Sequence, residues 1–498
     1  MDNLQSLSYF YPELFLTGLI IISIIYDLFL DRSKSDRVGW VMVAGLIIIT
    51  IILWFQDHNR ITTLFSNAIV LDPFSTFFKI LMIFSTILVA IISLYSDDLN
   101  EYRKGEYFTL LGIVLFGLFL MVSSIDLIMV YLSIEIVSIM SFVLAGYLKQ
   151  NTKSNEAALK YVVYGAFSSG IMLFGLSYIY GLTGSTNFFE IQKVITNSSS
   201  ESNSVILLSI IMILAGFGYK VSAVPFHFWT PDVYEGSPTT ITAYLSVAPK
   251  AGAFAMMVRF FNQIFSDGGA LVSSADSVSS SILAWPDIIS LLAVITMTLG
   301  NVVAIQQNSI KRMLAYSSVA HAGYILLALP VMSSQSIYAI MLYFIMYLFM
   351  NLGAFFVLIV VKNKTEGETF DDFKGLGWEM PFIGIVMTLF MISLTGLPPT
   401  AGFIAKFYIF AALINGGESF YWLVIIGGIN SVISLYYYIR VVKVMYFDGE
   451  KSESLIHPST MMTALLLITA VPTLIFGIYW TPLANWIHSS LVFYLQNI

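Results

Sequence analysis

The sequence contains no cysteine and only five histidines. Without cysteine the chain cannot hold a thiolate-bound iron–sulfur cluster, a thiolate metal site or a disulfide, and cysteine usage gives no information on the redox compartment. Membrane cytochromes need histidines at matched depth on facing helices, and no two histidines here share a predicted helix. We also find no phosphate-binding loop, dinucleotide motif, metal-ligand cluster or nucleic-acid footprint. We therefore expect no cofactor or metal in this chain and no nucleic-acid partner.

Charge is scarce as well. Lys, Arg, Asp and Glu make up 11% of the 498 residues, 58% are hydrophobic, and the mean hydropathy is +0.84. A soluble domain has roughly 25% charged residues and about 45–50% apolar ones. These values predict an all-α polytopic membrane protein without a soluble domain. The net charge of −7 says little about partners, because membrane orientation depends on where Lys and Arg lie.

Apolar stretches long enough to span a bilayer recur along the whole chain. A span needs about 20 mostly apolar residues, and this criterion predicts about fourteen transmembrane helices. The candidate spans are 11–30, 38–56, 73–95, 106–123, 125–148, 156–181, 204–224, 239–262, 284–305, 312–331, 335–361, 380–413, 420–446 and 459–481. The 380–413 stretch is long for one span, and Thr395-Gly396-Leu397-Pro398-Pro399 at its centre predicts a break into two half-helices.

Basic residues alternate between the loops of the two sides. If the 31–37 loop lies inside the cell, only Arg60 and Lys193 lie in loops on the opposite side. The basic residues on the inside would be Arg32, Lys34, Arg37, Arg103, Lys104, Lys149, Lys153, Lys311, Arg312, Lys362, Lys364, Lys374, Lys443 and Lys451. Because cytoplasmic loops are enriched in Lys and Arg, the pattern predicts that both termini lie outside the cytoplasm.

Glu135, Lys160, Lys220, Lys250 and Lys406 fall inside the predicted spans, most of them far from any helix end. A charge near the bilayer centre costs on the order of 3 kcal/mol or more, so such residues usually pair with one another or line a polar path. Their number in one chain predicts a relay for a small cation, most simply the proton.

Glu135 and Lys220 are predicted to lie at similar depth. Glycines before Lys220 and Pro225 after it should loosen the helix, supplying carbonyl groups and room for water. A carboxylate that moves toward or away from a lysine changes how firmly the lysine holds its proton, so the pair can act as a gated proton donor. Two alternatives remain: a protonated Glu135 bonded between helices, and a static interhelical salt bridge.

The other lysines differ in depth. Lys250 follows Pro249 near the centre of its span, too far from either end to snorkel. Lys160 lies little more than one turn into its helix, so a snorkelled position at the inside surface is as good an interpretation as a relay role. Lys406 follows the double proline, beside the predicted break. The Lys220 and Lys406 helices are predicted to run in opposite directions, and paired broken helices of this kind point to an inverted-repeat transporter.

Two histidines and one loop have open interpretations. His227 and His321 could bridge the lysines by proton exchange, although a lone membrane histidine is more often a packing residue. Membrane-interface belts and core packing account for the abundant tyrosines and other aromatic residues. The 362–379 loop is the only sizeable charged one and carries Glu366, Glu368, Asp371 and Asp372. A solvated turn is its plainer interpretation, and a docking surface for a neighbouring subunit is the alternative.

With these residues assembled, the chain resembles the antiporter-like membrane subunits of respiratory complex I, the bacterial NADH-quinone oxidoreductase. The resemblance runs from the segment Leu-Asp-Pro-Phe-Ser-Thr-Phe-Phe-Lys-Ile at 71–80 to about residue 446. Its most specific parts are Val-Pro-Phe-His-Phe-Trp-Thr-Pro-Asp-Val-Tyr-Glu-Gly-Ser-Pro at 224–238, Ser-Ile-Lys-Arg-Met-Leu-Ala-Tyr-Ser-Ser-Val-Ala-His-Ala-Gly-Tyr at 309–324, and the 396–410 segment. Lysine at 406, where the M-type subunit usually has glutamate, and an end soon after the last span favour the N-type subunit.

The resemblance implies a domain plan and a set of site residues. N-terminal transmembrane helices at 1–105 would precede two inverted five-helix repeats at 106–262 and 284–446, and a C-terminal transmembrane helix would occupy 459–498. In the family, two half-channels meet in a polar axis at mid-membrane. The family's first-repeat glutamate matches Glu135, its broken-helix lysine Lys220, its bridging lysine Lys250 and its terminal charged residue Lys406. Lys160, His227 and His321 are further candidates for the relay.

The resemblance also implies the function and the partners. We expect a proton-translocating subunit in a bacterial plasma (inner) membrane, flanked by other complex I membrane subunits. NADH, FMN, iron–sulfur clusters and quinone would bind partner subunits, so enzyme activity would belong to the complex. One alternative is a subunit of a multi-subunit Na+/H+ antiporter. Another is a structural membrane spacer whose buried charges are inert. Keeping inert charges inside the membrane costs free energy, which disfavours this alternative.

Overall fold

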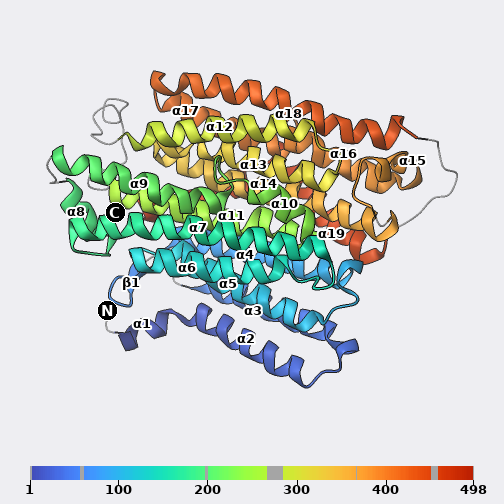
Figure 1. Cartoon of the computed structure of the whole chain (residues 1–498), viewed down its shortest axis with the longest axis horizontal. Coiled ribbons are helices and arrows are strands. Elements are labelled where there is room, and N and C mark those ends of the chain that lie inside the picture. The colour runs from blue at the N-terminus through green and yellow to red at the C-terminus, as the bar shows by residue number, and fades with distance from the viewer. Residues whose placement is uncertain are drawn as a thin grey trace.

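Helices dominate the computed structural model, and most of them run side by side along one direction (Figure 1). The structure describes residues 3–56, 61–196, 200–265, 284–365, 367–449 and 458–496. Within these ranges, thirteen helices are long and apolar enough to cross a membrane, or up to 14 if the bent pair Asp371–Glu379 and Pro381–Thr395 counts as one span. The predicted all-α polytopic fold is therefore confirmed. Arg60 and Lys451 lie outside the described residues.

The long helices agree with the predicted spans to within a few residues at each end. They are α2 (Tyr11–Leu28), α3 (Asp36–Phe55), α4 (Pro73–Leu94), α5 (Lys104–Ser123), α6 (Leu127–Ala145), α7 (Thr152–Thr183), α9 (Ser200–Val221), α11 (Thr239–Phe265), α12 (Trp285–Ile305), α13 (Ile310–Leu326), α14 (Ser334–Thr365), α16 (Pro381–Thr395), α17 (Ala401–Asn415), α18 (Tyr421–Phe447) and α19 (Thr460–Ile478). Shorter elements lie between or beyond them: α1 (Asn3–Tyr9), the hairpin β1 (Thr62–Leu64) and β2 (Ile69–Leu71), α8 (Phe188–Thr196), α10 (Trp229–Gly236), α15 (Leu376–Glu379) and α20 (Thr481–Gln496).

The C-terminal part contains the expected span, α19, followed by a second helix. After α19 the chain turns and forms α20, which packs against α4 and α14. The ring of Trp486 lies 4.6 Å from that of Phe77 on α4, centre to centre. Ile487 and Leu491 are buried on the same helix. The apolar face of α20 thus finds a partner surface that only the folded bundle provides.

The bundle has a buried centre and apolar flanks. The apolar part of α11 is entirely buried, and α13 and α14 are nearly so. In Figure 1, α2 and α3 lie along one edge, and α12, α17 and α18 lie along the opposite edge. The outer helices expose large apolar side chains such as Phe15, Ile48 and Val432. Lipid tails are as apolar as leucine, so such surfaces are stable against a bilayer.

Both termini lie at the same end of the bundle, on the left in Figure 1. We call this the terminal end. The opposite end holds the turns at 29–35, 95–103, 146–151 and 306–309, and most of the basic loop residues lie there. We call it the basic end.

Two buried ion pairs fasten the N-terminal helices to the bundle. Lys79 on α4 is 2.6 Å from Glu13 on α2, Nζ to Oε1, and both side chains are nearly inaccessible. Arg259 on α11 makes two bonds of 2.8 and 3.0 Å to the carboxylate of Asp72, which also caps α4 by accepting from the Ser75 amide. In both pairs the cation has a carboxylate partner.

The Lys79–Glu13 pair gives a stability prediction. Removing one partner of a buried ion pair leaves an uncompensated charge, which costs about 3–5 kcal/mol. We expect Lys79→Met to lower the thermal unfolding temperature of the purified protein, and the double variant Lys79→Met, Glu13→Gln to recover most of the loss. Lys34→Met, at an exposed pair with Asp31, serves as the control. Equal unfolding temperatures for the single and double variants would show that the pair does not hold α2 in place.

Candidate functional site

Lys220 lies directly beside a helix break. Helix α9 ends at Val221, Ser222 has φ +66°, and α10 begins only at Trp229. The predicted loosening of the helix around Lys220 is thus confirmed. The Lys220 ammonium is buried and donates a hydrogen bond of 3.0 Å to the hydroxyl of Ser138 on α6.

Glu135 lies one turn before Ser138 on the same helix. Its carboxyl group is within electrostatic range of Lys220, but the ammonium bonds to Ser138 instead. The buried Oε1 of Glu135 has no hydrogen-bond partner among the described residues. This arrangement differs from the static salt bridge considered above, because a serine hydroxyl stands where the carboxylate would be.

Lys250 connects the two halves of the chain. It lies at the middle of α11, after Pro249 inside the helix, and is 2% exposed. Its ammonium donates to the carbonyl of Ser318 on α13 at 2.9 Å and to the Ser318 hydroxyl at 3.0 Å. The ammonium therefore has two neutral oxygen partners from the second half of the sequence.

Helix α13 carries a polar row that continues from this contact. Ser318, His321 and Tyr324 follow one another at intervals of three residues, so they lie along one side of the helix. His321 is buried and pairs through Nδ1 with the Tyr343 hydroxyl at 2.7 Å and through Nε2 with the Tyr438 hydroxyl at 3.1 Å. The imidazole is within electrostatic range of both Lys250 and Lys406, which fits the predicted bridging position.

Lys406 lies beside the second break. Helix α16 ends at Thr395 and α17 begins at Ala401, which confirms the predicted pair of half-helices. The buried Lys406 ammonium donates to the Thr395 carbonyl at 2.8 Å and to the Ser431 hydroxyl at 3.0 Å. Gly396 has φ +89°, and a Cβ there would lie 2.8 Å from Cδ of Lys406, so only glycine suits this turn.

A tyrosine completes the connection to Lys406. The ammonium lies 4.4 Å from the centre of the Tyr324 ring, a cation–π distance. Core packing does not describe these tyrosines fully, because Tyr324 also contacts Lys406, and Tyr343 and Tyr438 also hydrogen-bond to His321. The signal in the sequence is the spacing of Ser318, His321 and Tyr324, which places three polar side chains on one side of the helix.

Two candidates lie apart from this row. His227 is buried in the segment between α9 and α10, with its ring against Phe228 and its Nδ1 without a partner among the described residues. Lys160 lies at the basic end, where it pairs with Asp232 and Glu156, each at 2.7 Å, and its side chain is 35% exposed. The structure thus gives Lys160 the snorkelled position.

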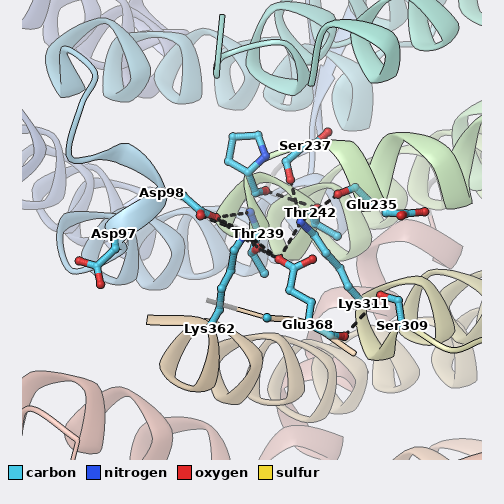
Figure 2. Close-up of polar contacts among 12 residues, drawn as sticks. Asp97, Asp98, Glu235, Ser237, Thr239, Thr242, Ser309, Lys311, Lys362 and Glu368 are labelled. Carbon is cyan, nitrogen blue, oxygen red and sulfur yellow. Dashed lines mark hydrogen bonds and ion pairs between the residues drawn. The ribbon is translucent and has the colours of Figure 1, made fainter. Parts of the chain in front are cut away.

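Charged residues at the basic end form a separate network (Figure 2). Lys311, at the start of α13, donates to the Ser237 carbonyl at 2.8 Å and to Glu368 at 3.2 Å. Lys362 is 2.7 Å from Glu368 and 3.0 Å from Asp98. Burial alone would raise the pKa of Glu368, but the two lysines hold it down to about 2. The solvated-turn interpretation is therefore wrong for Glu368, whose side chain is 17% exposed.

Comparison with known proteins identifies relatives across nearly the whole chain. A family model described as "NADH:quinone oxidoreductase/Mrp antiporter, TM" matches residues 124–434. The curated protein NADH-quinone oxidoreductase subunit N 2 of Chloroherpeton thalassium is 45% identical over 486 residues, which cover 96% of this chain and 93% of that protein.

Two solved structures have a similar fold over nearly the whole of this chain. A chain of respiratory complex I from Thermus thermophilus with bound aureothin has a TM-score of 0.78 at 25% identity, and the match covers 95% of this chain and 98% of that one. A chain of the Mrp complex from Dietzia sp. has a TM-score of 0.82 at 20% identity, and the match covers 97% of this chain and 51% of that one. The second likeness concerns the fold alone.

The low pKa of Glu368 makes stability depend on pH. Its ordinary value is 4.5, so the ionised group contributes stability that is complete above that pH and is lost as the pH falls toward 2. We expect Glu368→Gln to lower the free energy of unfolding near neutral pH by about 3 kcal/mol or less. The difference from the unmodified protein should shrink in acid. Thermal unfolding measured from neutral pH downward tests this, and a difference that stays constant into acid would contradict it.

Proposed function

The chain belongs to the NADH:quinone oxidoreductase/Mrp antiporter family of membrane subunits, and we propose that it is the proton-translocating N-type subunit of a bacterial NADH-quinone oxidoreductase. One observation carries the proposal. Lys220, Lys250 and Lys406 are buried, and each ammonium bonds to neutral hydroxyl or carbonyl oxygens. The buried cations Lys79 and Arg259, by contrast, are neutralised by carboxylates.

This difference separates relay groups from structural ones. A paired buried lysine keeps its proton in a fixed contact, because releasing the proton would leave its carboxylate partner uncompensated. A lysine whose hydrogen bonds go only to neutral oxygens breaks no ion-pair contact when it gives up its proton. Lys220, Lys250 and Lys406 therefore suit proton transfer, whereas Lys79 and Arg259 suit fastening.

The proposed path starts at Glu135 and ends at Lys406. The proton affinity of Lys220 changes as the distance between Glu135 and Lys220 changes. Lys220 then exchanges protons with Lys250. From there Ser318, His321 and its tyrosine partners lead to Lys406. Hydroxyl and imidazole groups both donate and accept hydrogen bonds, so each can pass a proton onward with water between them. Release then occurs toward the terminal end. Lys160 and His227 lie apart from this path and are secondary candidates for the relay.

The rest of the reaction belongs to other subunits in this proposal. NADH oxidation and quinone reduction, with FMN and iron–sulfur clusters, take place on partner chains, and this chain holds no cofactor. Neighbouring membrane subunits on the flanks of this chain supply the energy, as movement of charge along its buried lysines. The basic end faces the cytoplasm, in keeping with the positive-inside rule, so both termini lie outside. The segments 106–262 and 284–446 form the two inverted repeats.

A second candidate is a subunit of a multi-subunit Na+/H+ antiporter. The family description includes Mrp antiporters, and the fold matches a chain of an Mrp complex. The polypeptides that copurify in mild detergent discriminate the two. Partners that carry flavin and iron–sulfur clusters support the oxidoreductase, and sodium-dependent transport without such partners supports the antiporter.

The double variant Lys220→Ala, Glu135→Ala tests the proposed function. In inverted membrane vesicles, we expect NADH-driven proton uptake to fall by at least roughly tenfold, because positioned proton-transfer groups contribute factors of this size or more. Lys34→Met, at an exposed pair, should leave uptake unchanged. Immunodetection of the assembled complex shows that the variant is present. Undiminished proton yield per NADH in the double variant would reject the proposal.

A further inference from the structure

Lys311 is a buried lysine at the basic end that the path above does not use. It is 1% exposed, and its carboxylate neighbour Glu368 is shared with Lys362, which lies closer. Its other bonds go to the carbonyls of Glu235, at 3.2 Å, and Ser237, at 2.8 Å. Neutral oxygens thus provide most of its contacts, as they do for the relay lysines.

A row of unsatisfied hydroxyls begins beside Lys311. Thr230, Tyr234 and Ser237 recur at intervals of four and three residues along α10 and its C-terminal cap, so they share one side of the helix. The side-chain oxygen of each is buried and has no hydrogen-bond partner among the described residues. Buried polar atoms of this kind usually bond to ordered water. The row therefore suits a hydrated path rather than dry packing.

The row leads toward Lys250. The hydroxyls of Tyr234 on α10 and Tyr347 on α14 both lie near the Ser318 hydroxyl, and Lys250 donates to that same hydroxyl at 3.0 Å. Lys311 and Ser318 are two turns apart on α13, about 10 Å along the helix axis. Side-chain hydroxyls with water molecules between them can bridge that length.

We propose that Lys311 loads protons into an entry path at the basic end, which runs through Ser237, Tyr234 and Ser318 to Lys250. The inference rests on the proposed function, since it supplies the protons that Lys250 passes on. In each cycle the Lys311 ammonium gives one proton to the hydrated hydroxyl row, and one proton from the solvent at the basic end restores it. Only N–H and O–H bonds are broken and formed.

Charged neighbours shape this entry. Glu368 stays ionised near neutral pH because of its low pKa, so it acts as a positioning residue that keeps a negative charge beside Lys311. Asp98, on the turn before α5, is 15% exposed and adds a second carboxylate toward solvent. Lys362 and Arg312 hold these acids and Glu235 in place through ion pairs. Figure 2 shows Lys311 pointing into this group, with Ser237 and Glu368 beside it.

A purely structural role for Lys311 makes a different prediction from proton loading. An ion-pair clamp needs only a cation, so arginine should serve as well as lysine. A loading group must release its proton, which arginine does not do in proteins. Similarly, a hydroxyl without a protein partner contributes little to stability, so its removal is structurally neutral or favourable.

The test uses Lys311→Arg and Tyr234→Phe in the assembled complex, measured in inverted membrane vesicles. We expect NADH-driven proton uptake to fall by at least roughly tenfold in each variant. The thermal unfolding temperature of Tyr234→Phe should be unchanged or higher. Lys364→Arg is the matched control, because Lys364 pairs with Glu379 at the same end and is 24% exposed. This control should pump normally.

Two outcomes separate the entry path from the proposed function. If Lys311→Arg and Tyr234→Phe pump at the unmodified rate while Lys250→Met in the same membranes does not, the entry path is wrong and the proposed function stands. If Lys250→Met also pumps normally, the proposed function itself fails. Recovery by Lys311→Arg of uptake that Lys311→Met has lost would assign Lys311 to the structure alone.

Discussion

A cationic side chain inside an apolar helix bundle requires oxygen atoms as hydrogen-bond partners, and the rest of this structure is arranged to supply them. Lys79 and Arg259 receive carboxylates and become fixed joints between helices. Lys220, Lys250 and Lys406 receive serine hydroxyls and backbone carbonyls. The first solution neutralises the charge. The second solvates the charge without neutralising it, which is the condition that the proposed proton relay requires.

The helix breaks follow from the same requirement. A regular helix uses most of its carbonyls internally, so a break provides additional carbonyls for a buried cation. The break after α16 frees the Thr395 carbonyl, which accepts from Lys406. The break after α9 gives Lys220 a place at a helix end, opposite Ser138. Helix α13, which has no break of its own, contacts Lys250 through Ser318 and Lys406 through Tyr324, and thereby joins the two halves of the chain.

The sequence predicted the spans, both breaks and the buried lysines, because apolar run length, proline and isolated charge are local signals. It did not predict which groups meet across helices. That Lys220 bonds to Ser138 rather than Glu135 depends on how α6 and α9 are rotated against each other, and no local pattern records this rotation. The contacts of Tyr343 and Tyr438 could not be predicted for the same reason, since each reaches His321 from a different helix. Glu368 was misassigned because only the folded chain places Lys311 and Lys362 beside it.

The central claim is that the buried lysines are joined by hydroxyl and imidazole groups with water between them. The most direct measurement is an experimental density map of the assembled complex at a resolution that shows ordered water. The account predicts water molecules beside Ser138, near Ser318 and between His321 and Lys406. A map in which tightly packed apolar side chains fill these three positions and leave no room for water would contradict it.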